Sequence, residues 1–156
     1  MKTGLLFSGQ GAQSVGMAKS LYENCEAVRE LFDRADDALS MKLSKCCFEG
    51  PSSELTKTSV CQPALFLHGF AVVEVMRQKG ILGEPSTALG LSLGELTAHA
   101  FAGTFSFETG LKIVAERHDL RVPEFRLGLE RAEGQDRVRR HAGRAAPDRQ
   151  RDLIRV

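Results

Sequence analysis

The chain has 156 residues, the length of about one ordinary domain. It is 42% hydrophobic and 26% charged, close to the average for folded proteins, which excludes a collagen-like, disulfide-stapled or wholly disordered chain. The formal net charge of +1 provides no global field that would draw the protein onto nucleic acid or a membrane.

The cysteines and the apolar stretches narrow the class of protein further. The four cysteines form no C-x-x-C pair, and no Cys/His cluster has the spacing of a zinc site. Residues 1–7 are too short and too quickly polar for a signal peptide. Residues 63–76 form the longest apolar stretch, which falls short of the ~20 residues that a membrane span needs. We therefore expect free thiols and a soluble, cytoplasmic protein without a metal or a cofactor.

The first half of the chain predicts one strand followed by helices. Residues 3–7 are apolar and end in Ser8-Gly9-Gln10-Gly11, which is typical of a buried strand and a glycine turn. Helices are expected over residues 15–22 and 25–39, the second with one apolar face. Residues 44–58 are predicted to be irregular. A long, nearly all-apolar helix over residues 62–79 follows, and Gly80 and Gly83 end it.

A second strand over residues 87–91 leads directly into a helix over residues 93–101. Ser106 is expected to cap a last helix that runs through His118. This order of elements indicates an α/β fold with parallel strands. Two strands make only an incomplete parallel sheet with flanking helices. We therefore expect a poorly folded chain whose apolar helix and open strand edge meet water.

The charge pattern changes near residue 120. Residues 121–156 carry ten Arg, no Lys and six acidic residues, whereas the preceding part mixes Lys and Arg. We divide the chain into residues 1–120 and an Arg-rich tail, residues 121–156. Three interpretations of this tail are open. It is an arm that binds an acidic partner, a solvated and disordered tail, or the product of a shifted reading frame in a GC-rich gene. We favour the third, because the chemistry of the first 120 residues is left unfinished.

The segment Gly90-Leu91-Ser92-Leu93-Gly94 fits G-x-S-x-G and lies between a predicted strand and a predicted helix, as a nucleophile elbow requires. Such a turn holds the serine hydroxyl out at the sheet edge, and the helix N-terminus stabilises negative charge nearby. We predict Ser92 as the nucleophile and the amide of Leu93 as an oxyanion donor. The alternative is a plain strand-to-helix turn.

The glycine turn after the first strand is the second candidate region. Parallel neighbours end at the same sheet edge, so Gln10 is expected beside the end of the second strand, where it would supply another oxyanion donor. The alternative is a glycine turn with polar filler.

Several motifs in order carry a resemblance to a known family. They are Phe7-Ser8-Gly9-Gln10-Gly11-Ala12-Gln13, then Gly50-Pro51, Glu54-Leu55 and Thr58, then Gln62-Pro63-Ala64-Leu65, and last Gly90-Leu91-Ser92-Leu93-Gly94-Glu95. From about residue 3 to residue 120 the chain resembles malonyl-CoA:acyl carrier protein transacylases. The resemblance implies the N-terminal portion of an α/β-hydrolase-like large domain, with a small ferredoxin-like domain inserted further along.

The resemblance also implies a reaction in fatty acid biosynthesis. Ser92 would take the malonyl group from malonyl-CoA, and the phosphopantetheine thiol of acyl carrier protein would then accept it. Gln10 and the Leu93 amide would form the oxyanion hole, and Arg117 would bind the malonyl carboxylate. Without the resemblance, Arg117 is an exposed cation at a helix end. The expected partners are malonyl-CoA and acyl carrier protein, with neither nucleic acid nor membrane.

Two features depart from the family pattern. Leu91 stands where the family has a histidine, and the family's general-base histidine lies beyond residue 156. His99 is two helical turns from Ser92, His68 and His118 are expected on helix surfaces or in packing, and His141 lies in the tail. Because serine without a base is a weak nucleophile, we expect the 156-residue chain to be inactive.

Three alternatives to this function stay open. A serine esterase of the α/β-hydrolase type would keep the elbow but would leave Gln10 and Arg117 unexplained. An acyltransferase domain of a polyketide synthase is a closer variant, and the start at Met1 just before the first strand favours a freestanding enzyme. The third alternative is a non-catalytic protein that binds an acidic partner through its Arg-rich tail.

Overall fold

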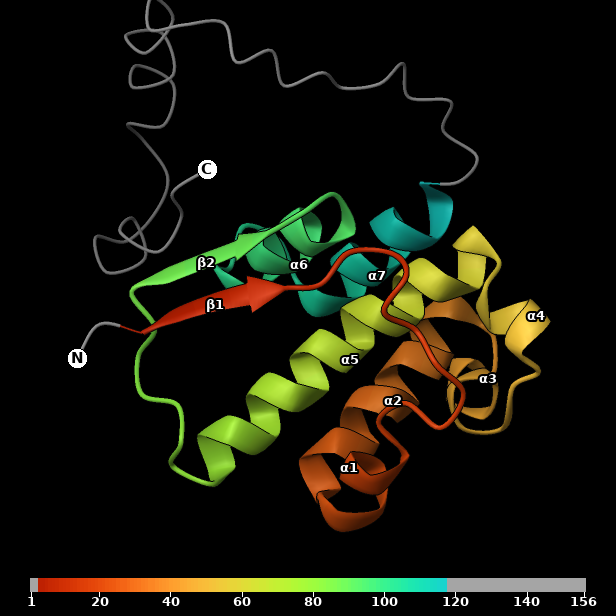
Figure 1. The fold of residues 1–156 in the computed structure, drawn as a ribbon, viewed down its shortest axis with the longest axis horizontal. Coiled ribbons are helices and arrows are strands. Elements are labelled where there is room, and N and C mark those ends of the chain that lie inside the picture. The colour runs from red at the N-terminus through yellow and green to blue at the C-terminus, as the bar shows by residue number, and fades with distance from the viewer. Residues whose placement is uncertain (1–2, 118–156) are drawn as a thin grey trace, which may run out of the picture.

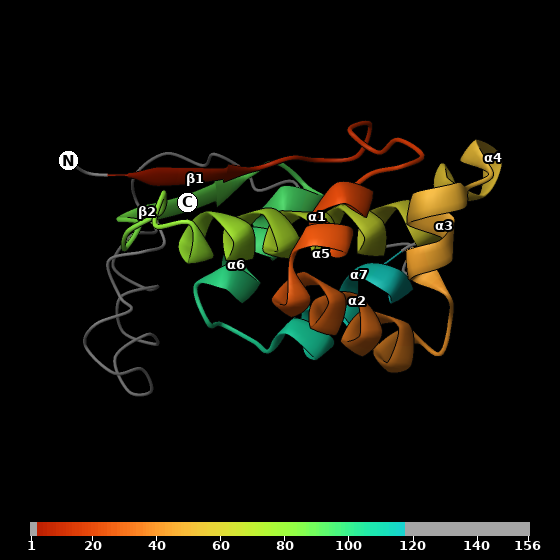
Figure 2. The same cartoon turned by 90° about the horizontal axis from the view of Figure 1, so that it is seen from below.

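The computed structural model describes residues 3–117, so His118, His141 and the Arg-rich tail lie outside the described residues. A layer of helices packs against a short parallel sheet (Figures 1 and 2). The described elements in chain order are β1 (Gly4–Phe7), α1 (Lys19–Asn24), α2 (Glu26–Leu39), α3 (Leu43–Glu49), α4 (Ser52–Leu55), α5 (Thr58–Gln78), β2 (Thr87–Gly90), α6 (Leu93–Phe101) and α7 (Phe107–Glu116). The α/β prediction with parallel strands is therefore confirmed.

Helix α5 forms the centre of the fold. Its residues 60–67 are all buried, and α2, α6 and α7 pack around it (Figure 1). Phe66 of α5 has its ring centroid 5.0 Å from that of Phe70 and 5.8 Å from that of Phe107 at the start of α7. The expectation that this apolar helix meets water is wrong for these residues, because the surrounding helices enclose them.

The length of α5 also differs from expectation. The helix has 21 residues and is long and apolar enough to cross a membrane by length and composition alone. More than half of its most apolar window is buried inside the fold. Its apolar character is therefore explained by packing in a protein core.

The two strands pair in parallel, with Gly4 opposite Thr87 and Phe7 opposite Gly90. One face of this sheet is covered, because Phe7 and Ala88 are buried in a small cluster with Val73 of α5 and with a residue of α6. Side chains alternate between the two faces of a strand, so Leu6 and Leu89 point away from the helices. Both of these leucines are exposed.

Two predicted segments differ from the structure. Residues 44–58 hold α3 and α4, where an irregular segment was expected. For α3, the reason is a contact across eight positions of sequence. The carboxylate of Asp36 accepts hydrogen bonds from the Ser44 backbone N–H (2.9 Å) and the Ser44 hydroxyl (2.7 Å) at the start of α3. This satisfies an amide that would otherwise lack a partner in the first helical turn.

The first helix begins later than predicted, at Lys19, because the preceding residues form a turn that contacts α3. The Gly16 N–H donates to the Cys47 carbonyl at 2.8 Å, and Gly16 and Ala18 both have positive φ angles. A continuous helix over residues 15–22 cannot include such angles.

The last described helix follows its predicted cap. The Ser106 hydroxyl accepts a hydrogen bond from the Thr109 N–H at 3.2 Å, as predicted from its sequence position. Helix α7 ends at Glu116, so Arg117 is the first residue after it. This end of α7 brings Arg117 toward the turn that joins β2 to α6.

Candidate active site

The turn between β2 and α6 has the geometry of a nucleophile elbow. Ser92 is exposed, with φ 56° and ψ −104°, a backbone conformation that few residues other than glycine adopt. Although Ser92 stands at the N-cap of α6, its hydroxyl makes no capping hydrogen bond to that helix. The hydroxyl is therefore free for another partner.

Two glycines allow this sharp turn. A Cβ atom on Gly90 would overlap with the carbonyl carbon of Gly94, and a Cβ atom on Gly94 would overlap with the carbonyl oxygen of Phe7. The backbones of β1, β2 and α6 thus approach one another more closely than any side chain would permit. The close packing fixes Ser92 at the carboxyl edge of the sheet.

Arg117 is the hydrogen-bond partner of Ser92 within the described residues. Its Nη2 donates to Ser92 Oγ at 3.4 Å, across 25 positions of sequence. The other terminal nitrogen, Nη1, is buried and has no hydrogen-bond partner among residues 3–117. A buried cationic donor without a partner is costly, so this atom is available for an anionic group that enters the site.

The segment after β1 lies beside the elbow. A Cβ atom on Gly9 would lie 3.0 Å from the Leu91 carbonyl oxygen, so the backbone just before Gln10 contacts the turn that holds Ser92. Gln10 itself is exposed. Leu93 is the first residue of α6, and an amide at that position has no acceptor within its own helix. The structure therefore brings Ser92 and Arg117 together, with Leu93 and the Gln10 segment alongside.

Residues 5–145, which make up most of the chain, match the model of the acyl transferase domain family. The chain belongs to the acyl transferase domain family. The family match extends past residue 120, so the predicted boundary there stays a prediction.

Several related proteins share the acyl transferase domain. The malonyl CoA-acyl carrier protein transacylase of Bacillus subtilis is 45% identical over 116 residues, which are 74% of this chain and 36% of that protein. The crystal structure of the acyl-carrier-protein-S-malonyltransferase of Bartonella henselae superposes with a TM-score of 0.72 at 43% identity, covering 76% of this chain and 38% of that one. A malonyl-transacylase solved in complex with a type II PKS acyl-carrier protein has a TM-score of 0.72 at 34% identity, covering 76% and 38%.

The chain thus spans a little over a third of the length of these relatives. Their match confirms the expected fold class, an N-terminal portion of the acyl transferase domain. More than half of each relative's chain lies outside the matched region.

Two histidines of this acyl transferase domain lie within the described residues. His99 is in the last turn of α6, where its Nδ1 is 3.4 Å from the Thr104 hydroxyl. His68 is half-buried on α5, and burial lowers its pKa. Within residues 3–117, neither histidine has a hydrogen bond to Ser92. Among the described residues, the site therefore holds the Ser92 hydroxyl and the Arg117 cation, and neither histidine bonds to that hydroxyl.

One residue of α5 carries a feature that residue-level reasoning missed. Gln62 is buried, and its Oε1 has no hydrogen-bond partner among the described residues. Next to it, burial raises the pKa of the Cys61 thiol, and the neighbouring backbone amide of Gly11 offsets part of that rise. The available signal was an amide side chain at the start of a nearly all-apolar helix.

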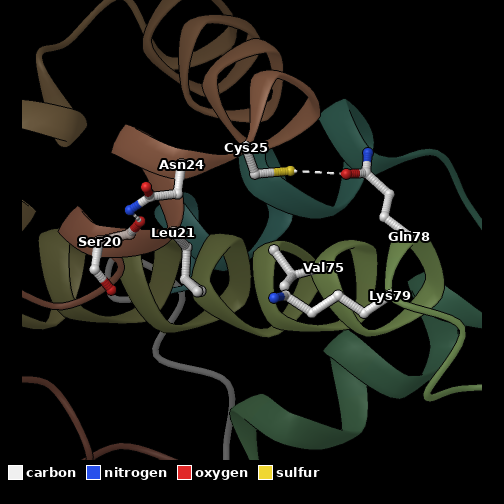
Figure 3. A pocket seen from close by; sticks show the side chains of 7 residues that line it. All are labelled: Ser20, Leu21, Asn24, Cys25, Val75, Gln78 and Lys79. Atoms are coloured by element: carbon white, nitrogen blue, oxygen red, sulfur yellow. Dashed lines mark hydrogen bonds between the residues drawn. The ribbon is translucent and has the colours of Figure 1, made fainter.

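A pocket elsewhere on the acyl transferase domain lies between α1 and α5. Figure 3 shows its lining, where the Cys25 thiol donates to Gln78 Oε1 at 3.1 Å and Lys79 lies nearby. The elbow contributes no residue to this lining. The pocket is therefore separate from the Ser92 site.

Proposed function

We propose that this protein acts as an [acyl-carrier-protein] S-malonyltransferase of fatty acid biosynthesis in the cytoplasm. It would transfer a malonyl group from malonyl-CoA to the phosphopantetheine thiol of acyl carrier protein through a malonyl ester of Ser92. The observation that carries this proposal is the Arg117 guanidinium, which bonds to the Ser92 hydroxyl and has a second, unpartnered nitrogen. The names of the relatives and the complex with an acyl-carrier protein support the substrate and the partner.

In the first half-reaction, Ser92 Oγ attacks the thioester carbonyl carbon of malonyl-CoA. A C–O bond forms, the C–S bond breaks, and the CoA thiolate takes up the proton that the serine hydroxyl loses by way of a general base. Negative charge develops on the carbonyl oxygen during the attack. The Leu93 amide at the N-terminus of α6 and Gln10 are the proposed donors to this oxygen.

In the second half-reaction, the phosphopantetheine thiol attacks the ester carbonyl carbon. A C–S bond forms, the C–O bond to Ser92 breaks, and the proton that the thiol loses passes by way of the general base to the serine oxygen. The exposed position of Ser92 at the sheet edge gives a long, flexible thiol access to the ester.

Arg117 explains why the acyl group would be malonyl. A guanidinium binds a carboxylate through two parallel hydrogen bonds, and malonyl carries a carboxylate whereas acetyl does not. The buried Nη1 provides a donor that no other described side chain uses. A serine esterase has no need of such a cation beside its nucleophile.

The general base of the reaction is proposed to come from outside residues 3–117, because no described histidine bonds to Ser92. Because serine without a base is a weak nucleophile, residues 3–117 by themselves are expected to be inactive. The position of Leu91, where related enzymes are expected to have a histidine, affects the surroundings of Ser92 rather than the class of reaction.

The test uses a completed enzyme in which this chain, up to Arg117, is continued by the part of the Bacillus subtilis relative that follows its matched region. Incubation with malonyl-CoA should add one malonyl group, which mass spectrometry places on Ser92. The Ser92→Ala variant should carry none. Ser14→Ala, an exposed serine of the loop after β1, serves as the matched control and should be labelled normally. A malonyl adduct of normal yield on the Ser92→Ala variant would exclude this nucleophile.

A further inference from the structure

The turn after β1 that carries Gln10 is closed by a hydrogen bond of its own. The Gly11 backbone N–H donates to Gln13 Oε1 at 2.8 Å. Only Ala12 separates the two residues, so the hydrogen bond forms a small ring within the turn. Gln13 is half-buried, whereas Gln10, Gly11 and Ala12 are exposed. The side chain of Gln13 therefore joins a partly buried position to an exposed stretch of backbone.

Packing does not fix the conformation of this exposed stretch. Gly11 has a φ angle of 111°, in the region that favours glycine, and a Cβ atom there would meet no other atom within 4 Å. A glycine in open space has access to many backbone conformations. A side-chain oxygen that accepts from the glycine N–H selects one of them. The hydrogen bond from Gly11 to Gln13 therefore decides the path of the turn.

The two sides of the turn contact fixed parts of the fold. On one side, the Gly11 N–H also lies beside the Cys61 thiol, because this amide lowers the pKa of that thiol against the effect of burial. Cys61 is fully buried in α5. On the other side, Gly9 lies against the Leu91 carbonyl of the elbow. Gln10 stands between these two contacts, next to the residue that Gln13 holds.

Gln10 has free hydrogen-bond donors in this arrangement. Among residues 3–117 it makes no hydrogen bond through its side chain or its backbone N–H, whereas the Gly11 N–H is occupied. An oxyanion donor acts only when it lies about 3 Å from the position of the developing charge. Whether Gln10 meets that condition depends on the path of the turn.

We propose that Gln13 is a positioning residue for acyl transfer, whose side-chain oxygen holds the Gly11 amide and thereby aims Gln10 at the carbonyl oxygen of the acyl group on Ser92. This role rests on the proposed function, and Gln13 acts through Gln10 rather than on the substrate. Every acyl thioester has that carbonyl oxygen. Loss of Gln13 should therefore slow malonyl and acetyl transfer by the same factor, whereas Arg117 distinguishes the two acyl groups.

The first experiment tests the hydrogen bond in the 156-residue chain without any reaction. Hydrogen exchange of the Gly11 amide is measured by NMR. Gln13→Leu removes the acceptor and should speed this exchange about fivefold or more. Gln13→Glu keeps an acceptor oxygen at the same reach and should retain the slower exchange. Ser14→Ala, at an exposed neighbour, is the control and should change nothing. Circular dichroism checks that each variant keeps its fold.

The second experiment tests the consequence for the reaction in the completed enzyme. Gln13→Leu should lower kcat about tenfold for malonyl and for acetyl transfer alike, with KM for either acyl-CoA unchanged. Gln13→Glu should retain most of the native kcat, and Ser14→Ala should retain all of it. Rescue by a single acceptor oxygen separates a positioning role from a general loss of stability.

Unchanged exchange of the Gly11 amide in Gln13→Leu would overturn the positioning role. Equal losses of kcat in Gln13→Leu and Gln13→Glu would do the same, as would a loss confined to malonyl transfer or to KM. A completed enzyme with native Gln13 that transfers no malonyl group would remove the proposed function and with it the catalytic role of Gln13. The exchange of the Gly11 amide would then still decide whether Gln13 holds the turn.

Discussion

The helices and the sheet differ in how much of their apolar surface is covered by other residues of the described part of the chain. On the helical side, α5 is enclosed by neighbouring helices, and Phe66 is fully buried among other aromatic rings. On the sheet side, two strands are covered on one face only, and Leu6 on the other face is exposed. The difference shows that a run of apolar residues is enclosed where its packing partners lie within the described residues. It stays exposed where they do not.

The largest expected effect concerns the enclosed side. Phe66→Ala should lower the free energy of unfolding by about 3–5 kcal/mol, because it removes a buried ring and leaves a cavity. Leu6→Ala is the matched change on the open side and should alter the same free energy by less than about 0.5 kcal/mol. Urea unfolding followed by circular dichroism measures both. Similar losses for the two variants would mean that Leu6 is already covered in solution.

The next effect concerns Arg117, which joins the two sides because it follows α7 and bonds to the elbow at the sheet edge. In the completed enzyme, Arg117→Ala should slow malonyl transfer on the order of a hundredfold and acetyl transfer far less, because only malonyl has a carboxylate to pair. Measuring kcat/KM for both acyl-CoA substrates tests this. Arg77→Ala, at a guanidinium stacked on the Phe101 ring, is the control and should slow neither. Equal losses for the two acyl groups would reject the carboxylate role of Arg117.

The smallest expected effect is at the rim of the helical side, where Arg34 of α2 bonds to the Glu108 carboxylate of α7 with a 2.9 Å contact from its Nε. The hydrogen bond from Arg34 holds the pKa of Glu108 below its ordinary value of 4.5. The folded state therefore binds this proton less tightly than the unfolded state. The resulting stability is present above pH 4.5 and is lost as the pH falls toward the lowered pKa.

Both side chains of this pair are substantially exposed, 52% for Arg34 and 40% for Glu108, so solvent weakens the interaction. We expect Glu108→Gln to lower the free energy of unfolding by about 1 kcal/mol or less at pH 7 and to have a smaller effect near pH 3. Unfolding curves at the two pH values measure the difference. The control is Lys57→Met, which removes another exposed ion pair, the one between Lys57 and Glu54 within a single turn. A larger effect at pH 3 than at pH 7 would contradict the assignment.

Local signals in the sequence were sufficient for much of this fold. The cap of α7 was predicted because Ser106 and Thr109 are three residues apart and interact within one turn. The elbow was predicted because its glycines and its serine lie within five consecutive residues. Where the residues that determine a local structure lie close together in the sequence, the sequence pattern alone predicts that structure.

Contacts between distant residues account for what was missed. Helix α3 depends on Asp36, eight positions before Ser44, and no rule of local spacing connects them. The bond from Arg117 to Ser92 spans 25 positions, and only the family resemblance singled out Arg117. In the sequence, Gln62 stands out only as part of a motif, because its lack of a hydrogen-bond partner among the described residues arises only when the helices pack.

Gly90, Gly94 and the intervening Leu91 of the elbow have different consequences for protein engineering. Any side chain at position 90 or 94 would collide with backbone atoms, so a saturation library at either position should retain glycine alone. Position 91 lies between them with its side chain directed into open space. A larger or more polar residue at position 91 should therefore leave the path of the backbone unchanged, so a reporter group attached there would lie next to Ser92.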